Sequence, residues 1–223
     1  MSIQDHSPQN PRFALKELRL WAPSRATQGA KAKRVLDIAV SLALIVLLSP
    51  VLALISLAVA LESQGPVLFC QHRTGQNGRI FAMLKFRSMR VTEDDAAVVQ
   101  AKENDPRITR IGRILRTTSL DELPQLFNVL WGEMSLVGPR PHAVAHDDYY
   151  AARIAAYTTR QKVKPGMTGW AQVNGARGET PELRHMQARV ALDLWYIAHR
   201  SFLLDLKILA KTPLEVLKRR NAR

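Results

Sequence analysis

The sequence is poor in cysteine, in periodic glycine or proline, and in acidic residues, and each shortage excludes a class of protein. The single cysteine, Cys70, cannot form an internal disulfide, which excludes a disulfide-stabilised framework. The 11 glycines and 12 prolines follow no repeat, which excludes collagen-like and fibrous chains. A chain of 223 residues, 47% of them hydrophobic, can instead bury a sizeable core in roughly one or two domains.

The shortage of acidic residues leaves a formal net charge of +13, which favours anionic partners such as nucleic acids, phospholipids or nucleotides. Arg107, Arg110, Arg113 and Arg116 recur every third residue and predict an amphipathic helix with a basic stripe. The stripe is either simply solvated or suited to nucleic-acid phosphates, although no helix-turn-helix, zinc ligand set or aromatic RNA-binding surface accompanies it. A membrane-tethered nucleic-acid-binding protein is therefore the competing hypothesis.

A long apolar run lies near the N-terminus. Residues 38–61 carry no charge, and as a straight helix these 24 residues would measure about 36 Å, enough to cross a hydrocarbon core of about 30 Å. Pro50, preceded by Ser49, lies at the middle of the run, where proline kinks or breaks a helix. Two arms of about 18 Å suit a re-entrant hairpin in one leaflet, with the Ser49 hydroxyl bonding a carbonyl that the break frees.

The flanking charges agree with a re-entrant segment. Residues 1–34 carry seven Lys and Arg against two acids, and residues 62–223 carry 25 against 16, so neither flank is predicted to be translocated. A plain spanning helix, a cleaved signal peptide and a buried core helix are the alternatives. We predict a mobile or interfacial arm over residues 1–30, a re-entrant membrane helix over 31–64 broken at Ser49-Pro50, and a cytoplasmic domain over 65–223.

Short-range patterns predict a small β-hairpin followed mainly by helices. Two apolar segments, residues 67–71 and 79–86, flank a turn that contains Asn77-Gly78, a strong hairpin signal. An acidic triplet at residues 93–95 is predicted to begin a solvated helix. Helical patterns occupy residues 181–196 and 202–220, and the second is basic at its tip, as suits anionic lipid. The predicted fold class is α+β, mostly helical.

Two adjacent carboxylates, Asp121 and Glu122, form the local arrangement best suited to chemistry. Ser119 and Glu122 have the spacing of a capping box, in which both would only start a helix. Pro124 disfavours that register, because proline is tolerated in the first turn of a helix and not further inside. With Asp121 near the cap, the helix dipole favours an ionised carboxylate and also attracts phosphate, so a nucleophile and an anionic substrate would share one site.

Two glycine- and proline-containing segments, residues 137–142 and 164–179, are predicted to be loops that bind a ligand. Glycine lets the backbone approach a ligand closely, and Arg140, Gln172 and Arg177 supply donors suited to phosphate oxygens and to the edge of a uracil-like base. Neither segment has the spacing of a Walker or dinucleotide-binding motif.

Seven motifs, in order along the chain, resemble those of bacterial sugar transferases of the monotopic phosphoglycosyl transferase family. They are Lys33-Arg34, Ser49-Pro50, Lys85-Phe86-Arg87-Ser88-Met89, Asp105-Pro106-Arg107, Ser119-Leu120-Asp121-Glu122-Leu123-Pro124-Gln125, Gly138-Pro139-Arg140-Pro141, and Lys164-Pro165-Gly166 through Asn174-Gly175. The resemblance implies transfer of a hexose 1-phosphate from a UDP-sugar to undecaprenyl phosphate with release of UMP, at the cytoplasmic face of the bacterial inner membrane.

The resemblance also implies roles for individual residues. In the family the aspartate of the pair is the nucleophile that forms a phosphosugar-aspartyl intermediate, and the glutamate helps to hold Mg²⁺; these roles fall on Asp121 and Glu122. Substrate or phosphate binding is expected of the basic and amide side chains in the shared motifs, which are Lys85, Arg87, Arg116, Arg140, Gln172 and Arg177.

Residues 138–144 and 177–180 are most similar to the branch that initiates colanic-acid and O-antigen assembly. That branch transfers glucose 1-phosphate or galactose 1-phosphate, and its members carry an additional N-terminal bundle of membrane helices. We therefore expect an enzyme that initiates exopolysaccharide, capsule or O-antigen assembly, with anionic lipid and a second copy of the chain as further partners and no nucleic acid.

Overall fold

A computed structural model of the chain describes residues 29–90, 105–178, 180 and 182–217. The arm predicted over residues 1–30 and the acidic triplet at 93–95 therefore lie almost wholly outside the described residues. The helices are α2 (Ala30–Glu62), α3 (Arg110–Thr118), α4 (Gln125–Trp131), α5 (Val144–Ala151), α6 (Trp170–Val173), α7 (Leu183–His199) and α8 (Phe202–Leu217). The strands are β1 (Leu68–Thr74), β2 (Ile80–Phe86), β3 (Ser135–Val137) and β4 (Gly166–Thr168), and the 3₁₀ turns are η1 (Gln76–Gly78), η2 (Leu120–Glu122) and η3 (Tyr157–Lys162). The predicted class, α+β and mostly helical, is confirmed.

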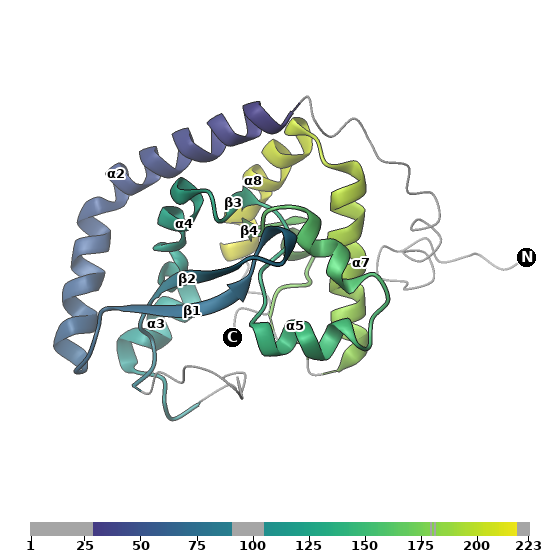
Figure 1. Ribbon diagram of the computed structural model, residues 1–223. Coiled ribbons are helices and arrows are strands. Elements are labelled where there is room, and N and C mark those ends of the chain that lie inside the picture. The colour runs from purple at the N-terminus through teal and green to yellow at the C-terminus, as the bar shows by residue number, and fades with distance from the viewer. Residues whose placement is uncertain (1–28, 91–104, 179, 181, 218–223) are drawn as a thin grey trace, which may run out of the picture.

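Helix α2 arches over one side of the molecule and encloses the hairpin, α3 and α4 (Figure 1). The helix is continuous through Pro50, so the predicted break is a bend within one 33-residue helix. Because Pro50 has no amide proton, the carbonyl of Val46 loses its partner in the helix. The Ser49 hydroxyl donates to this carbonyl at 2.8 Å, as the sequence predicted.

The outer face of α2 is a stripe of exposed apolar side chains that follows both arms of the helix. Its members are Val35, Ile38, Leu42, Val46, Leu47, Val51, Leu54, Leu57 and Leu61. By length and composition α2 is able to cross a membrane, and it is the single helix of this kind in the described part of the chain. A stripe of this size on a protein surface marks contact with a membrane or another protein.

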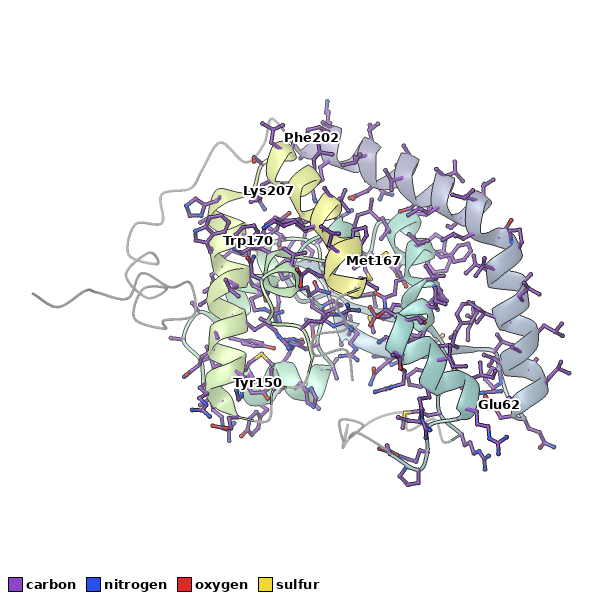
Figure 2. The ribbon with its side chains drawn as sticks, turned by 180° about the vertical axis from the view of Figure 1, so that it is seen from behind. Glu62, Tyr150, Met167, Trp170, Phe202 and Lys207 are labelled. Carbon is purple, nitrogen blue, oxygen red and sulfur yellow. The ribbon has the colours of Figure 1, made fainter. Side chains whose placement is uncertain are left out.

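Both ends of α2 are fastened to the rest of the fold by polar side chains. At its start, Lys33 Nζ donates to Asp205 Oδ2 of α8 at 2.6 Å, and Asp37 accepts hydrogen bonds from Ser135 and Leu136 at 3.1 and 3.0 Å. At its end, Glu62 accepts from the amide of Ile111 in the first turn of α3 at 3.0 Å. Figure 2 shows these two ends, with Phe202 of α8 near the start and Glu62 beside α3.

Strands β1 and β2 form the predicted antiparallel hairpin. Strand β1 continues past its predicted end at residue 71 to Thr74, and β2 begins at Ile80. Asn77 and Gly78 at the turn have φ values of 56° and 77°, the left-handed conformation that asparagine and glycine tolerate. Side chains of Phe81 and Met83 are buried, so this face of the hairpin packs on the core. The helical patterns at 181–196 and 202–220 correspond to α7 and α8.

The parallel pairing of β3 with β4 was not predicted. Each strand has three residues, too few for an alternating pattern, and the pairing joins segments 31 positions apart in register, Ser135 with Gly166 and Val137 with Thr168. The backbones meet so closely that a Cβ on Gly166 would lie 2.1 Å from the amide nitrogen of Gly138. These glycines therefore bring the two predicted ligand-binding loops together.

Candidate active site

The Asp121–Glu122 pair lies in the 3₁₀ turn η2, directly before α4. Ser119 is the C-cap of α3, where its φ of 59° turns the chain, and Pro124 occupies the N-cap of α4 with a φ of −60°. The predicted register, with Asp121 near the cap and Pro124 in the first turn, is therefore wrong: Pro124 is the N-cap, and the carboxylates precede α4. The capping box is absent: Ser119 makes no side-chain cap hydrogen bond, and its hydroxyl accepts a hydrogen bond from Arg177.

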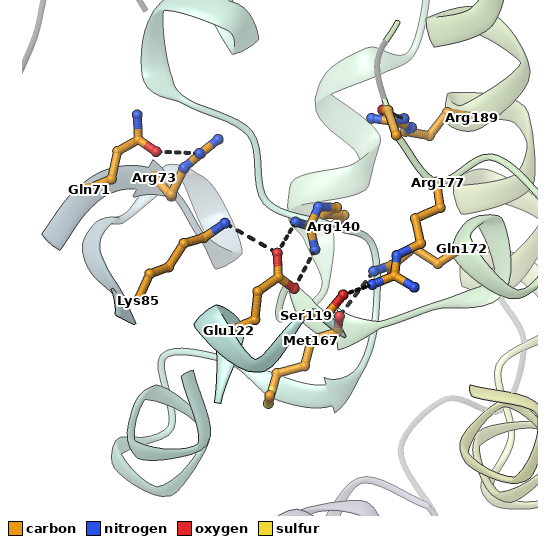
Figure 3. Close-up of polar contacts among 11 residues, drawn as sticks. Gln71, Arg73, Lys85, Ser119, Glu122, Arg140, Met167, Gln172, Arg177 and Arg189 are labelled. Atoms are coloured by element: carbon orange, nitrogen blue, oxygen red, sulfur yellow. Dashed lines mark hydrogen bonds and ion pairs between the residues drawn. The ribbon is translucent and has the colours of Figure 1, made fainter. Parts of the chain in front are cut away.

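Glu122 is held by two cations from different parts of the fold. Arg140 Nη1 donates to Oε2 at 3.1 Å, Arg140 Nη2 donates to Oε1, and Lys85 Nζ of β2 donates to Oε1 at 3.2 Å (Figure 3). Burial acts to raise the pKa of Glu122, but Arg140 and Lys85 hold the pKa well below the usual range. Glu122 is therefore a carboxylate with a fixed orientation and a permanent negative charge at neutral pH.

Asp121 differs from Glu122 in its surroundings. The residue is 7% exposed, and its carboxylate takes part in no hydrogen bond with the residues that the structure describes. Burial raises the pKa of Asp121 to about 6, against the opposing charges of Lys85, Arg116 and Arg140. The helix dipole was predicted to favour the ionised form, but the effect of burial on the pKa outweighs that of the positive charges nearby. At neutral pH the carboxylate is still mostly ionised, buried and unpaired, which are properties of a nucleophile.

Four of the six residues predicted to bind phosphate lie around the carboxylate pair, and the other two, Arg87 and Gln172, make different contacts. Lys85 and Arg140 contact Glu122, Arg177 donates to Ser119 two positions before Asp121, and Arg116 lies in the last turn of α3. These four side chains surround the carboxylate pair with positive charge. Arg113 of the predicted stripe is exposed on α3, whereas Arg107 precedes α3 and pairs with Asp105 at 2.8 Å.

Arg87 was predicted to bind phosphate, and the structure gives it another role. Its guanidinium is buried and donates to the carbonyls of Ser63 and Pro66, each at 2.6 Å, and to that of Val59 at 3.4 Å. The carbonyls at the end of a helix lack partners within the helix. Arg87 therefore secures the end of α2 to β2, and we withdraw it from the phosphate-binding set.

Gln172 of α6 was predicted to donate to a ligand, and its amide nitrogen instead donates to the Met167 carbonyl at 3.0 Å. Its amide oxygen is buried without a hydrogen-bond partner among the described residues. Figure 3 places Gln172 beside Arg177 and Met167. The group that remains available in Gln172 is thus an acceptor and not the predicted donor.

The loop that carries Arg140 is held by a hydrogen bond from Arg160, which forms a buried ion pair with Asp193. The sequence did not indicate this pair. Arg160 of η3 donates through Nη2 to the Arg140 carbonyl at 2.7 Å and through Nε to Asp193 of α7 at 2.8 Å. Arg160 and Asp193 are both buried. No local sequence pattern joins them, because the partners lie on elements 33 positions apart.

Comparison with known proteins agrees with this geometry. The family described as bacterial sugar transferase matches residues 28–219, which is most of the chain. The chain belongs to this family. As the family resemblance predicted, the matched region contains the carboxylate pair and the cations around it.

Three similar proteins are each called UDP-glucose:undecaprenyl-phosphate glucose-1-phosphate transferase. The protein of Escherichia coli (strain K12) is 55% identical over 180 residues, and that of Klebsiella pneumoniae is 54% identical over 180 residues. Each alignment covers 81% of this sugar transferase and 39% of the relative, so the chain spans about two fifths of their length. The protein of Caulobacter vibrioides is 48% identical over 221 residues, 99% of this chain and 83% of the relative.

The carboxylates of this sugar transferase fit one kind of metal site. Among the described residues, no three His, Cys, Asp or Glu side chains converge as they would in an all-protein site. Mg²⁺ in nucleotide-binding sites is usually bound by one or two carboxylates, with substrate phosphates and waters as the other ligands. Glu122 supplies one such carboxylate, oriented by Arg140 and Lys85, so the site fits Mg²⁺ that arrives with a phosphorylated substrate.

Proposed function

We propose that this sugar transferase moves a hexose 1-phosphate, in the first instance glucose 1-phosphate, from a UDP-sugar to undecaprenyl phosphate and releases UMP. The observation that carries the proposal is the contrast within the carboxylate pair: Glu122 is fixed by Arg140 and Lys85, whereas Asp121 is buried, unpaired and mostly ionised at neutral pH. The names of the similar proteins support glucose as the first sugar to test.

In the first step, an Asp121 carboxylate oxygen attacks the phosphorus that bears the sugar. The bond between this phosphorus and the oxygen that bridges to the other phosphate breaks, and UMP leaves with that oxygen. A mixed anhydride of Asp121 with the sugar phosphate remains, and no proton transfer is needed. Lys85 and Arg140 lie where they can stabilise the negative charge that develops on the phosphate oxygens.

In the second step, a phosphate oxygen of undecaprenyl phosphate attacks the same phosphorus and expels the Asp121 carboxylate. The product is undecaprenyl diphosphate sugar, and the carboxylate is regenerated. Because UMP leaves before the lipid reacts, the water-soluble donor and the membrane-bound acceptor need not occupy the site together. We therefore expect ping-pong kinetics.

Mg²⁺ would be held by Glu122 together with substrate phosphate oxygens. The ion would neutralise charge on the diphosphate and so make UMP a better leaving group. Arg140 and Lys85 already orient the Glu122 carboxylate before any ion binds.

The apolar stripe on α2 supports a monotopic position at the cytoplasmic face of the bacterial inner membrane. The bend at Pro50 and the outward-facing apolar side chains on both arms suit a re-entrant helix in one leaflet. We propose that this arrangement keeps the carboxylate pair near the phosphate of the lipid acceptor, for the initiating step of polysaccharide assembly. The competing hypothesis of a nucleic-acid-binding protein gains no support from the matched family.

The experiment that tests the proposal is a donor panel. Membranes that contain the protein are incubated with undecaprenyl phosphate and, in separate reactions, UDP-glucose, UDP-galactose or UDP-N-acetylgalactosamine, and UMP release is measured. We expect lipid-dependent turnover with UDP-glucose and none with membranes that contain the Asp121→Asn variant. Salt-sensitive binding to random oligonucleotides without UMP release from any donor would favour the competing hypothesis.

A further inference from the structure

The buried and half-buried arginines near the site differ in what their guanidinium groups bind. Arg140 pairs with Glu122, Arg160 pairs with Asp193, and Arg189 donates to the carbonyls of Ala176 and Gly178. These three are fully accounted for by partners within the chain. Arg160 and Arg189 therefore have roles that need no ligand, whereas Arg140 already has a carboxylate partner within the site.

Arg73 of β1 has no such partner. Its one hydrogen bond with the described residues runs from Nη2 to the side-chain oxygen of Gln71, a neutral amide. Its Nε is buried and has no partner among those residues. A buried cation is costly unless an anion or several acceptors compensate it. Arg73 thus has neither a carboxylate partner, as Arg140 and Arg160 have, nor two carbonyl acceptors, as Arg189 has.

The hairpin places Arg73 at the carboxylate pair. Arg73 pairs with Phe81 across the two strands, and Lys85 pairs with Phe69, so alternation puts Arg73, Gln71 and Lys85 on the same face of the hairpin. The backbone of Arg73 also forms a bridge to Ala143, just beyond the Arg140 loop. Figure 3 shows Gln71, Arg73 and Lys85 projecting from this face beside Glu122 and Arg140.

The charges around Arg73 are consistent with an anion site. Burial and the nearby charge of Arg140 lower the pKa of Arg73 to about 10, while Asp147 and Glu122 act in the opposite direction. The guanidinium stays protonated at neutral pH. It adds a positive charge to the side of Glu122 where Lys85 already lies.

We propose that Arg73 binds a phosphate oxygen of a substrate in this site and that Gln71 is the positioning residue that orients its guanidinium. The inference rests on the proposed function, since it assigns Arg73 to that same site. The phosphate comes either from the UDP-sugar or from the lipid acceptor. The Arg73 guanidinium carries five N–H protons, and its bond to Gln71 uses one of them, so protons on Nε and on the terminal nitrogens remain to donate to phosphate oxygens.

The test separates the two half-reactions and includes a binding measurement. Wild type, Arg73→Gln, Gln71→Glu and a control, Arg79→Gln, are compared; Arg79 lies on the same hairpin and is exposed. The first arm measures the rate of UMP release from UDP-glucose without lipid. The second adds undecaprenyl phosphate to protein already loaded with sugar phosphate. A third measures binding of UDP to the purified protein.

We expect Arg73→Gln to lose at least about tenfold in the arm whose phosphate Arg73 binds, as for removal of a charge-assisted hydrogen bond, and Arg79→Gln to stay within about twofold of wild type. Gln71→Glu should weaken the same arm, because the new carboxylate competes with phosphate for Arg73. This second variant keeps Arg73, so it tests the proposal even if Arg73→Gln does not fold.

The outcomes distinguish the inference from the function on which it rests. Loss in the first arm assigns the donor phosphate, and loss confined to the second assigns the acceptor phosphate. A wild type that transfers sugar phosphate, with Arg73→Gln and Gln71→Glu matching Arg79→Gln in all arms, would overturn the Arg73 assignment alone. A wild type that binds UDP through Arg73 and transfers nothing would support the assignment and count against the proposed function.

Discussion

Arg140 donates two hydrogen bonds to the Glu122 carboxylate, from Nη1 to Oε2 at 3.1 Å and from Nη2 to Oε1. This bidentate ion pair fixes the plane of the carboxylate. It also places a positive charge near Asp121, since Arg140 acts to lower the Asp121 pKa. The fork geometry, and not charge alone, sets this arrangement.

Replacement of Arg140 by Lys keeps the charge and removes the fork. We expect kcat/KM for UDP-glucose to fall by about 10- to 100-fold, the effect of losing one strong charge-assisted hydrogen bond. The matched control is Arg113→Lys, at an exposed position of α3, which should leave kcat/KM within about twofold. An Arg140→Lys enzyme as active as this control would reduce Arg140 to a part of the loop scaffold.

Glu122→Gln preserves the shape of the side chain and removes its charge. If Glu122 holds Mg²⁺, transfer should fall by at least about 100-fold, far more than the loss of about 1 kcal/mol that a helix cap would cause. Chelation of divalent ions with EDTA should abolish wild-type turnover, and added Mg²⁺ should restore it. Turnover that is indifferent to EDTA would remove the metal role from Glu122.

Asp121→Asn should stabilise the protein while it abolishes transfer. A carboxyl whose pKa is raised by burial from 3.8 to about 6 destabilises the fold once it is ionised, by on the order of 3 kcal/mol. Between these two pKa values the folded state holds more protons than the unfolded state, so this contribution to stability is lost as the pH rises from about 4 to 6.

The measurement is thermal or denaturant unfolding of wild type and Asp121→Asn at several pH values. The advantage of the variant should be near zero below pH 4 and should reach its full size above pH 6, since asparagine does not titrate. An advantage independent of pH, or a less stable variant at neutral pH, would show that Asp121 is not a destabilised buried carboxylate.

The path of α2 can be tested by labelling from the two sides of the membrane. In a Cys70→Ser background, single cysteines at Ala30 and at Gln64, both exposed, mark the two ends of the helix. The re-entrant proposal predicts that an impermeant reagent labels both from the cytoplasmic side. Pro50→Ala should straighten the helix toward a spanning form and lower activity. In the protein that keeps Pro50, labelling of the two cysteines from opposite sides of the membrane would contradict the proposal.

Features with a local signal were predictable from the sequence. Asn77-Gly78 indicated the hairpin, apolar periodicity indicated α7 and α8, and Ser49 supported the bend at Pro50 as expected. The carboxylate pair was identified because its two acids are adjacent, although Pro124 was expected in the first turn of α4 and is its N-cap.

Features that depend on distant segments were not predictable in this way. Arg87 was expected at the site because it shares a motif with Lys85, but its partners lie at the end of α2. The raised pKa of Asp121 follows from burial, which no short motif encodes. Arg73 was overlooked because the first strand was expected to end at Gln71. Continued alternation through Arg73 would have placed it on the same face as Lys85.

The central claim is that Asp121 carries the sugar phosphate, and covalent labelling tests it most directly. Purified protein is incubated with UDP-glucose radiolabelled in the sugar, without any lipid, and the protein is then digested and its peptides analysed. We predict label on the peptide that contains Asp121, release of one UMP for each label, discharge of the label by undecaprenyl phosphate, and no label on Asp121→Asn. An unlabelled wild type with kinetics that require both substrates together would contradict the account and would assign the attack directly to the lipid phosphate.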